Sequence, residues 1–260
     1  MLVDDVAQEL LQLVRNESVE VSDYVVGLRY AAVVVDGSRG REMGLAPIPT
    51  EDAIAFRRAR KPRRERLLEL VGSSNLIEKC LGIAMLNALS QYVLWNLGMV
   101  REFAIEKHSD IEVLAVSKMR GLKNIVVVGN LPLIVNEIKR AGIDPLVFER
   151  SILRRGRNEA LPEELEFRAI QSCEALVLSD ETLIDDTIDV ALMLSKNARV
   201  RILVGLAASL VPRPLFNAGL THIVSYRVVD VEEAIDVIKL GGDFDDLLAI
   251  LDPYIVYPRP

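Results

Sequence analysis

Cysteine and histidine are scarce in this chain of 260 residues, which has two of each. Cys80 and Cys173 lie far apart in the sequence, so a disulfide framework is excluded and the cytoplasm is the expected compartment. His108 and His222 do not complete a zinc cluster of the usual thiol and imidazole spacing. Because neither a GxSxG turn nor a paired cysteine and histidine motif occurs, the sequence points to no catalytic nucleophile.

Export and membrane signals are also lacking. The first ten residues carry Asp4 and Asp5 where a secretory signal would carry basic residues. The longest uncharged stretch, residues 80–100, is interrupted by asparagine, serine and glutamine, each of which would need a partner in lipid. We therefore expect this stretch to be a helix buried in a protein core, and no association with membranes.

Basic residues are in the minority. The chain has 31 basic and 38 acidic residues, a net charge of −7, which argues against a surface built to hold phosphate backbones. Residues 57–66 are the exception, with seven basic side chains in ten and no aromatic residue among them. We expect a solvated arginine face there and no specific nucleic-acid partner, with a phosphate-binding patch as the alternative.

The first part of the chain has an α+β pattern. Apolar residues at helical spacing over residues 1–16 predict an amphipathic helix that packs on a sheet. Residues 18–49 are rich in valine and tyrosine around the turn signal Asp36-Gly37, which predicts a small antiparallel meander. Asn75 is the expected N-cap of the long buried helix that follows it.

The pattern changes after Ser109, where short continuous apolar runs alternate with amphipathic helical stretches. This predicts a doubly wound parallel sheet with helices on both faces. We expect two domains, residues 1–108 and 109–260. The predicted strands are 125–128, 146–148, 175–178, 202–204 and 222–224.

Ligands of such sheets bind beyond the carboxyl ends of the strands, so the residues after each run are the candidates for a site. After the first run, Gly129 permits a tight turn, Asn130 is suited to cap a helix, and Pro132 fits the first turn of that helix. This turn lacks the further glycines of the dinucleotide motif GxGxxG, and a turn without ligand is an equal alternative. Glu149 ends the second run, where it is placed to accept ribose hydroxyls unless Arg150 neutralises it.

The third loop, residues 179–187, holds the densest cluster of oxygen ligands in the chain. Asp180 and Thr182 are nearest the strand end and are the better functional candidates, whereas Asp185 and Asp186 are expected to cap the next helix. In the fourth loop, Gly205 and the hydroxyl of Ser209 offer a surface for close backbone approach.

Taken in order, several segments resemble the family described as "putative heavy-metal chelation", in which an enolase N-terminal-like domain precedes a Rossmann-like domain. The resemblance spans nearly the whole chain. The third loop departs from the family's GTT-like pattern by carrying Asp180-Glu181-Thr182. The segments that carry the resemblance are GLRYAAV at 27–33, GLA at 44–46, GIAMLNAL at 82–89, VVGNLP at 127–132, FER at 148–150, SDETLIDDT at 179–187 and GLAASLVP at 205–212.

The resemblance implies a ligand site in the cleft between the two domains. It adds Arg29, Gly44 and Asn87 from the first domain to the strand-end residues of the second. On the Rossmann-like side it places Gly129, Asn130, Pro132, Glu149, Thr182, Gly205 and Ser209.

Two function classes follow. The first is a protein that binds a small, anionic or metal-complexed ligand in the cleft and acts as an enzyme of unknown reaction; the second is a non-catalytic metal or small-molecule binding or sensing protein. The expected cofactor is a metal ion or a nucleotide-like small molecule, and a homo-oligomer is compatible with the sequence. For a metal we expect oxygen ligands, mainly from Asp180, Glu181 or Glu149, with a bound small molecule completing the shell.

Overall fold

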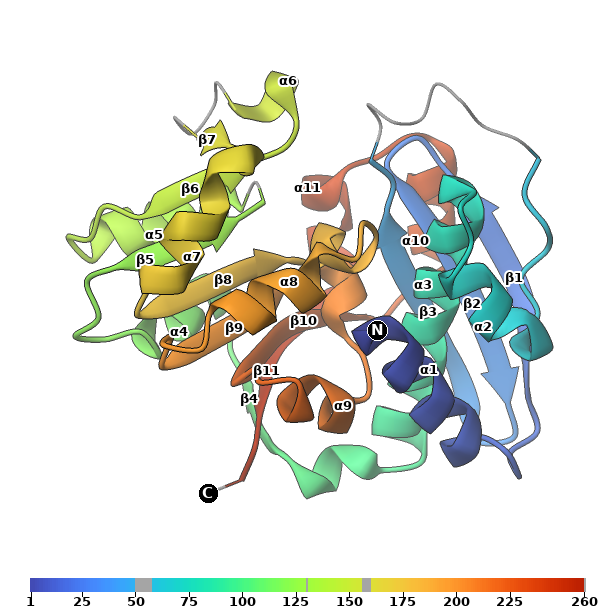
Figure 1. The fold of residues 1–260 in the computed structure, drawn as a ribbon. Helices are drawn as coiled ribbons and strands as arrows, with labels where there is room; N and C mark the ends of the chain where they lie inside the picture. Colours follow the sequence, from blue (N-terminus) through green and yellow to red (C-terminus); the bar gives the residue numbers. More distant parts are fainter. Residues whose placement is uncertain (50–57, 130, 156–159, 260) are drawn as a thin grey trace.

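The chain folds around two β-sheets with helices on both faces of each (Figure 1). The computed structural model describes residues 1–49, 58–129, 131–155 and 160–259. A three-stranded antiparallel sheet and an eight-stranded, mostly parallel sheet confirm the predicted α/β fold class. No helix in these ranges is both long and apolar enough to span a bilayer.

The small sheet is the predicted meander. Strands β1 (Val19–Val26), β2 (Tyr30–Gly37) and β3 (Gly40–Pro47) pair antiparallel in chain order. Gly37 pairs with Gly40, so the turn between β2 and β3 is Ser38-Arg39, just after the predicted Asp36-Gly37. Asp36 and Gly37 are therefore the last two residues of β2 and not the turn, because both still pair with residues of β3.

The large sheet has the order β4-β11-β10-β9-β8-β5-β6-β7. Strands β5 to β10 run parallel, and β11 and β4 are added antiparallel at one edge. The five predicted runs all lie in these strands. Their bounds are β4 Ala104–Lys107, β5 Ile125–Val128, β6 Leu146–Glu149, β7 Leu161–Pro162, β8 Ala175–Ser179, β9 Val200–Val204, β10 His222–Val228 and β11 Leu251–Tyr257.

Both faces of the large sheet are buried, which explains the continuous apolar runs. In β5, Val126 and Val128 join one hydrophobic cluster while Ile125 and Val127 join the other. The period of two therefore divides one strand between two cores. The helices are α1 Leu2–Leu13, α2 Leu67–Val71, α3 Leu76–Gln91, α4 Ile111–Ser117, α5 Pro132–Arg140, α6 Ile152–Arg155, α7 Glu166–Ser172, α8 Thr187–Leu194, α9 Pro212–Asn217, α10 Val231–Lys239 and α11 Phe244–Leu247.

Helix α3 is the buried helix that the sequence predicts, and Asn75 caps it. The Asn75 side chain accepts hydrogen bonds from the backbone N–H groups of Ile77 and Glu78. Helix α1 also forms as expected, but it packs mainly on α2, α3 and α9, so the expectation that it lies on a sheet is wrong. Helix α3 occupies the place beside the small sheet, packing on β2 and β3.

The chain crosses from the small sheet to the large one before residue 109. Strand β4, residues 104–107, pairs antiparallel with β11. In this pairing Tyr254 lies opposite Lys107, and Tyr257 lies opposite Ala104. The segment that precedes the expected domain boundary at residue 108 is thus the edge of the second sheet.

Candidate functional site

The order of the strands reverses between β5 and β8. From β5 the chain moves outward to β6 and β7, then returns to β8 on the other side of β5. The loops after β5 and β8 therefore diverge, and ligands of open α/β sheets bind where such loops separate.

A cavity of about 630 Å³ lies at this point. Its walls come from the strand-end loops of the large sheet and from the turn and strand ends of the small sheet, at Arg29, Tyr30 and residues 47–49. Among the residues predicted for the site, those that line it are Gly129, Pro132, Glu149, Asp180, Glu181, Thr182, Gly205 and Arg29.

Two glycines allow neighbouring strand ends to approach closely at the base of the cavity. Gly129 has φ +94°, and a Cβ atom there would lie 2.3 Å from the Cβ atom of Ser179. Gly205 has φ +146°, and its Cβ atom would lie 2.1 Å from the Cγ atom of Asp180. Glycine is required at both strand ends because a side chain would displace the loop after β8.

Asp180 is a buried acid of the cavity wall. Its carboxylate is 7% exposed and accepts a 2.7 Å hydrogen bond from the backbone N–H of Ala207. Burial raises the pKa of this carboxyl to about 7, and the charge of nearby Glu181 adds to the rise. Asp180 can therefore exchange a proton near neutral pH.

An arginine joins the second and third strand-end loops. Arg154, from α6, donates hydrogen bonds to both carboxylate oxygens of Glu181, at 2.5 and 2.7 Å, and to Glu149 Oε1 at 3.1 Å. Glu149 also accepts a 2.7 Å hydrogen bond from the N–H of Ser151. The charge of Glu149 is thus matched by Arg154, while the neighbouring Arg150 lies 3.9 Å from Asp185.

Thr182 and Asp185 have local partners. The Thr182 hydroxyl donates to the carbonyl of Ser179 at 2.7 Å. Asp185 accepts hydrogen bonds from the N–H and the hydroxyl of Thr187, which confirms its predicted role at the start of α8. Asp186 occupies the N-cap position of α8, as expected, but its side chain makes no capping hydrogen bond and pairs with Lys79 instead.

Three residues predicted for the site lie outside the cavity lining, and Asn130 lies outside the described residues. Ser209 is buried and its hydroxyl bonds to the Tyr254 hydroxyl. Gly44 lets β3 approach α3, because a Cβ atom there would lie 2.1 Å from the carbonyl oxygen of Ala84. Asn87 is 1% exposed and links the backbone of β3 to the backbone of the loop after β9. As site residues these four stay predictions.

Several lining residues escape the sequence analysis. Tyr226 lies inside β10, Asp243 and Asp245 are at the start of α11, and Glu112 belongs to α4. No motif marks these positions. They reach the cavity because β10, α11 and α4 pack around the ends of the strands, which only the tertiary structure reveals.

The side chains do not by themselves fit a complete metal centre. Both cysteines are buried in the apolar core, and burial raises the pKa of the Cys80 thiol to about 12 and that of Cys173 to about 11. Thiolates, which soft metals require, are disfavoured at both positions. Within the described ranges, no group of three or more histidine, cysteine, aspartate or glutamate side chains could hold a metal ion.

The basic run is partly engaged in ion pairs. Arg60 donates to both carboxylate oxygens of Glu78, and Arg64 donates to the carbonyls of Glu17 and Val19. Through these hydrogen bonds, Arg60 connects the basic run to α3, and Arg64 connects it to the start of β1.

Comparisons with known proteins cover both parts of the chain. Residues 112–256 match one family and residues 7–90 match a second, and both are described as "putative heavy-metal chelation". An uncharacterized protein of Methanocaldococcus jannaschii is 29% identical over 251 residues, which are 93% of this chain and 92% of the relative.

Two crystal structures of proteins of unknown function have this fold. The one from Pyrococcus horikoshii has a TM-score of 0.83 and 26% identity, and covers 99% of this chain and 100% of that one. The one from Desulfitobacterium hafniense has a TM-score of 0.73 and 20% identity, with 98% and 99% covered. Since the match at residues 112–256 includes more than half of the sequence, the chain belongs to the family described as "putative heavy-metal chelation".

Proposed function

We propose that the cavity binds a small molecule that carries a metal ion as a complex. The observation that carries this proposal is the composition of the wall. Eight carboxylates and three guanidinium groups line the cavity, so a free anion meets an unfavourable potential and a cationic centre a favourable one. The family description agrees with this chemistry.

A complex suits the cavity better than a bare ion. The protein supplies isolated oxygen ligands, with Asp180 as the foremost candidate, and the small molecule supplies the rest of the shell. The anionic arms of a chelating molecule have partners in Arg29 and in the N-terminus of α5, where Pro132 and its neighbours line the wall. Glu181 becomes a ligand only if it releases Arg154.

The test uses Mn²⁺–nitrilotriacetate, whose chelator leaves coordination positions open, and Mn²⁺ alone, each titrated into tag-free protein. We expect one equivalent of the complex to bind and the bare ion to bind much more weakly. Asp180→Asn should weaken binding of the complex by about tenfold or more. Asp144→Asn, at an exposed carboxylate outside the cavity, is the matched control and should bind as the unmodified chain does.

Two outcomes would refute the proposal. One is absence of binding of the complex to the unmodified chain, and the other is equal affinity in Asp180→Asn. Elemental analysis and native mass spectrometry of the protein as purified provide the second measurement, because a retained complex would identify the ligand.

A non-catalytic binding or sensing role is the alternative to an enzyme. Where Asp180 does not coordinate the metal ion, it is the group that favours catalysis, because an acid with a pKa of about 7 inside a cavity is suited to proton transfer. Mass spectrometry of the co-purified molecule after incubation separates these roles. An enzyme converts the molecule at a rate that falls in Asp180→Asn, whereas a binding protein returns it unchanged.

A further inference from the structure

The loop of residues 180–187 carries three of the eight carboxylates that line the cavity, and it contains a backbone conformation that is unfavourable for the residue that adopts it. Asp186, between η6 (Asp180–Leu183) and α8, has φ +62° and ψ +11°. Among the non-glycine residues of the described ranges it alone has positive φ. Aspartate adopts this left-handed conformation more easily than most residues, but still at a cost that its surroundings must offset.

Lys79 of α3 supplies that offset. Its Nζ atom lies 2.5 Å from Asp186 Oδ2, and Lys79 is only 9% exposed. The other oxygen, Asp186 Oδ1, is buried without a hydrogen-bond partner in the part of the chain that the structure describes. The ion pair is therefore the polar contact that orients this side chain.

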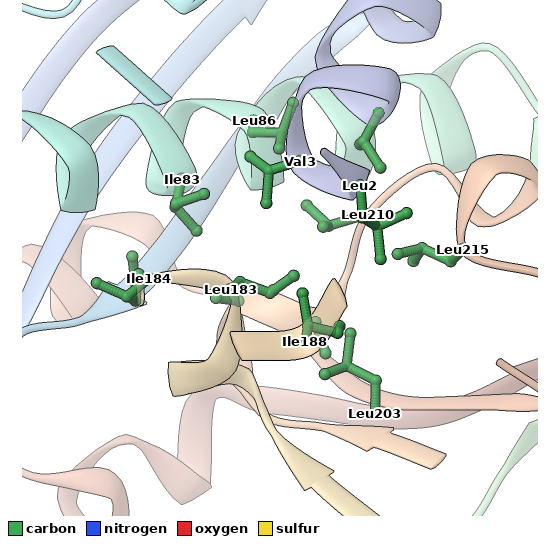
Figure 2. Close-up of a cluster of buried hydrophobic side chains, with 14 of the residues drawn as sticks. Leu2, Val3, Ile83, Leu86, Leu183, Ile184, Ile188, Leu203, Leu210 and Leu215 are labelled. Atoms are coloured by element: carbon green, nitrogen blue, oxygen red, sulfur yellow. The ribbon is translucent and has the colours of Figure 1, made fainter. Parts of the chain in front are cut away.

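The two residues of the pair are close in sequence to members of an apolar cluster: Lys79 lies one helical turn before Ile83, and Asp186 lies between Ile184 and Ile188. Figure 2 shows Ile83 and Leu86 of α3 facing Leu183, Ile184 and Ile188 of the loop and α8. Apolar packing holds the loop against α3 but does not select one backbone conformation, because it is not directional. A hydrogen-bonded ion pair is directional, so it can fix φ at Asp186.

The conformation at Asp186 sets where the neighbouring cavity groups lie. Glu181, Thr182, Asp185 and Thr187 all line the cavity and all lie within five residues of Asp186. If Asp186 relaxed to the right-handed region, the direction of the loop between η6 and α8 would change, and Asp185 with it.

We propose that Lys79 is a positioning residue of the cavity: it holds Asp186 in the left-handed conformation and so presents the acidic loop 180–187 to the ligand. The inference deepens the proposed function and rests on it for the role of the loop. Through Lys79, helix α3 of the first part of the chain would position a site that is built mainly from residues of the second part.

The test compares variants that separate two effects: the backbone strain at residue 186 and the loss of the positive charge at residue 79. Lys79→Met removes the cation and leaves Asp186 both strained and unpaired. Lys79→Met/Asp186→Gly and Lys79→Met/Asp186→Ala both remove the pair and differ by one methyl group, but only glycine takes φ +62° at little cost. Lys79→Arg keeps the cation. Lys123→Met, at an exposed lysine, is the matched control.

Hydrogen exchange of peptides that cover residues 180–187 is measured first, because it needs no ligand. We expect exchange in Lys79→Met and in the alanine double variant to be about tenfold faster or more, and exchange in the glycine double variant, Lys79→Arg and Lys123→Met to stay near that of the unmodified chain. Affinity for Mn²⁺–nitrilotriacetate should follow the same order.

Equal exchange in the glycine and alanine double variants would overturn the inference, as would unchanged exchange in a folded Lys79→Met variant. If Lys79→Met does not fold, the pair of double variants still decides the question. Failure of the unmodified chain to bind the complex would refute the proposed function alone, since the exchange result does not depend on a ligand.

Discussion

At the scale of single residues, Glu166 is a carboxyl group that burial keeps protonated at neutral pH. It is 3% exposed, and its Oε2 atom has no hydrogen-bond partner within the described ranges. Burial raises its pKa to about 8, and the charges of Glu163 and Asp185 contribute to the rise. Because the acid is neutral below this pH, the fold tolerates a polar group that is buried beside two other acids.

We expect Glu166→Gln to stabilise the protein increasingly as pH rises. The folded pKa lies above the ordinary value of 4.5, so the folded chain binds more protons between pH 4.5 and pH 8, and its free energy of unfolding falls across this window. The slope approaches about 1.4 kcal/mol per pH unit. Glutamine resembles the protonated acid and does not titrate, so urea denaturation at pH 5, 7 and 9 should show a growing difference between the two proteins.

Glu65→Gln is the control, because Glu65 is exposed. A difference between Glu166→Gln and the unmodified chain that stays constant from pH 5 to pH 9 would contradict the assignment.

At the scale of elements, replacing glycine by alanine should cost different amounts of stability at Gly205 and at Gly121, although both have positive φ. Gly205→Ala places a Cβ atom 2.1 Å from Asp180 Cγ at φ +146°, whereas Gly121→Ala, at φ +81°, meets no atom within 4 Å. Gly121→Ala should cost only the backbone strain, about 1 kcal/mol. Gly205→Ala should cost about 3 kcal/mol or more, because the loop after β8 must also move.

Chemical denaturation of both variants measures this difference. Equal losses would mean that the loop after β8 yields without cost. The contact with Ser179 makes Gly129→Val unsuitable as a probe of ligand binding, because the valine would disturb the fold first.

Helix α3 allows a second prediction at this scale. Asn75→Ala removes the oxygen that accepts from the N–H groups of Ile77 and Glu78, so it should lower the free energy of unfolding by about 1 kcal/mol. Asn75→Asp keeps an acceptor and is expected to lose much less. Urea denaturation decides, and equal losses in the two variants would show that the cap contributes nothing.

The elements that the sequence predicts are those with strong periodicity. Strand β8 is apolar at each of its first four residues and buried throughout, so its run alone identifies it. Strand β4, with the sequence AIEK, and the two-residue strand β7 carry no such signal, because they are short and partly exposed. They become strands only because a neighbour offers a free edge.

The candidate site divides in the same way. Gly129 and Asp180 follow predicted strands, and the rule for parallel sheets brings them to one edge. Arg154 and Asp243 come from short helices whose positions depend on packing, and Lys79 reads as an ordinary residue of a buried helix. Sequence periodicity places elements, but it does not determine which side chains meet across them.

At the scale of the whole molecule, each of the two hydrophobic clusters includes residues of both sheets. One hydrophobic cluster joins Ile83 and Leu86 of α3 to Leu183 and Leu203 of the large sheet and its loops (Figure 2). Asn87 crosses the same junction: its Oδ1 accepts from the N–H of Leu45, and its Nδ2 donates to the carbonyls of Leu206 and Ser209. The shared cluster and the hydrogen bonds of Asn87 together form the junction between the two sheets. Although the sequence suggests two domains, this junction favours unfolding of the chain as one unit.

We therefore expect a single unfolding transition, and a large loss of stability in Asn87→Ala. The substitution leaves three buried backbone groups without their partner, at about 1–3 kcal/mol each, so the free energy of unfolding should fall by at least about 3 kcal/mol. Asn136→Ala, on the exposed side of α5, should change it by about 0.5 kcal/mol or less.

The single tryptophan makes cooperativity measurable. Trp95 packs edge-on against Tyr254 of β11, 5.2 Å between ring centroids, so its fluorescence reports contact between the segment after α3 and the large sheet. Circular dichroism reports the helices of the whole chain. For one cooperative unit the two signals must change at the same urea concentration, in the unmodified chain and in Asn87→Ala alike. A tryptophan transition that precedes the loss of helix would instead show that the junction opens first, and that each sheet retains a stable core of its own.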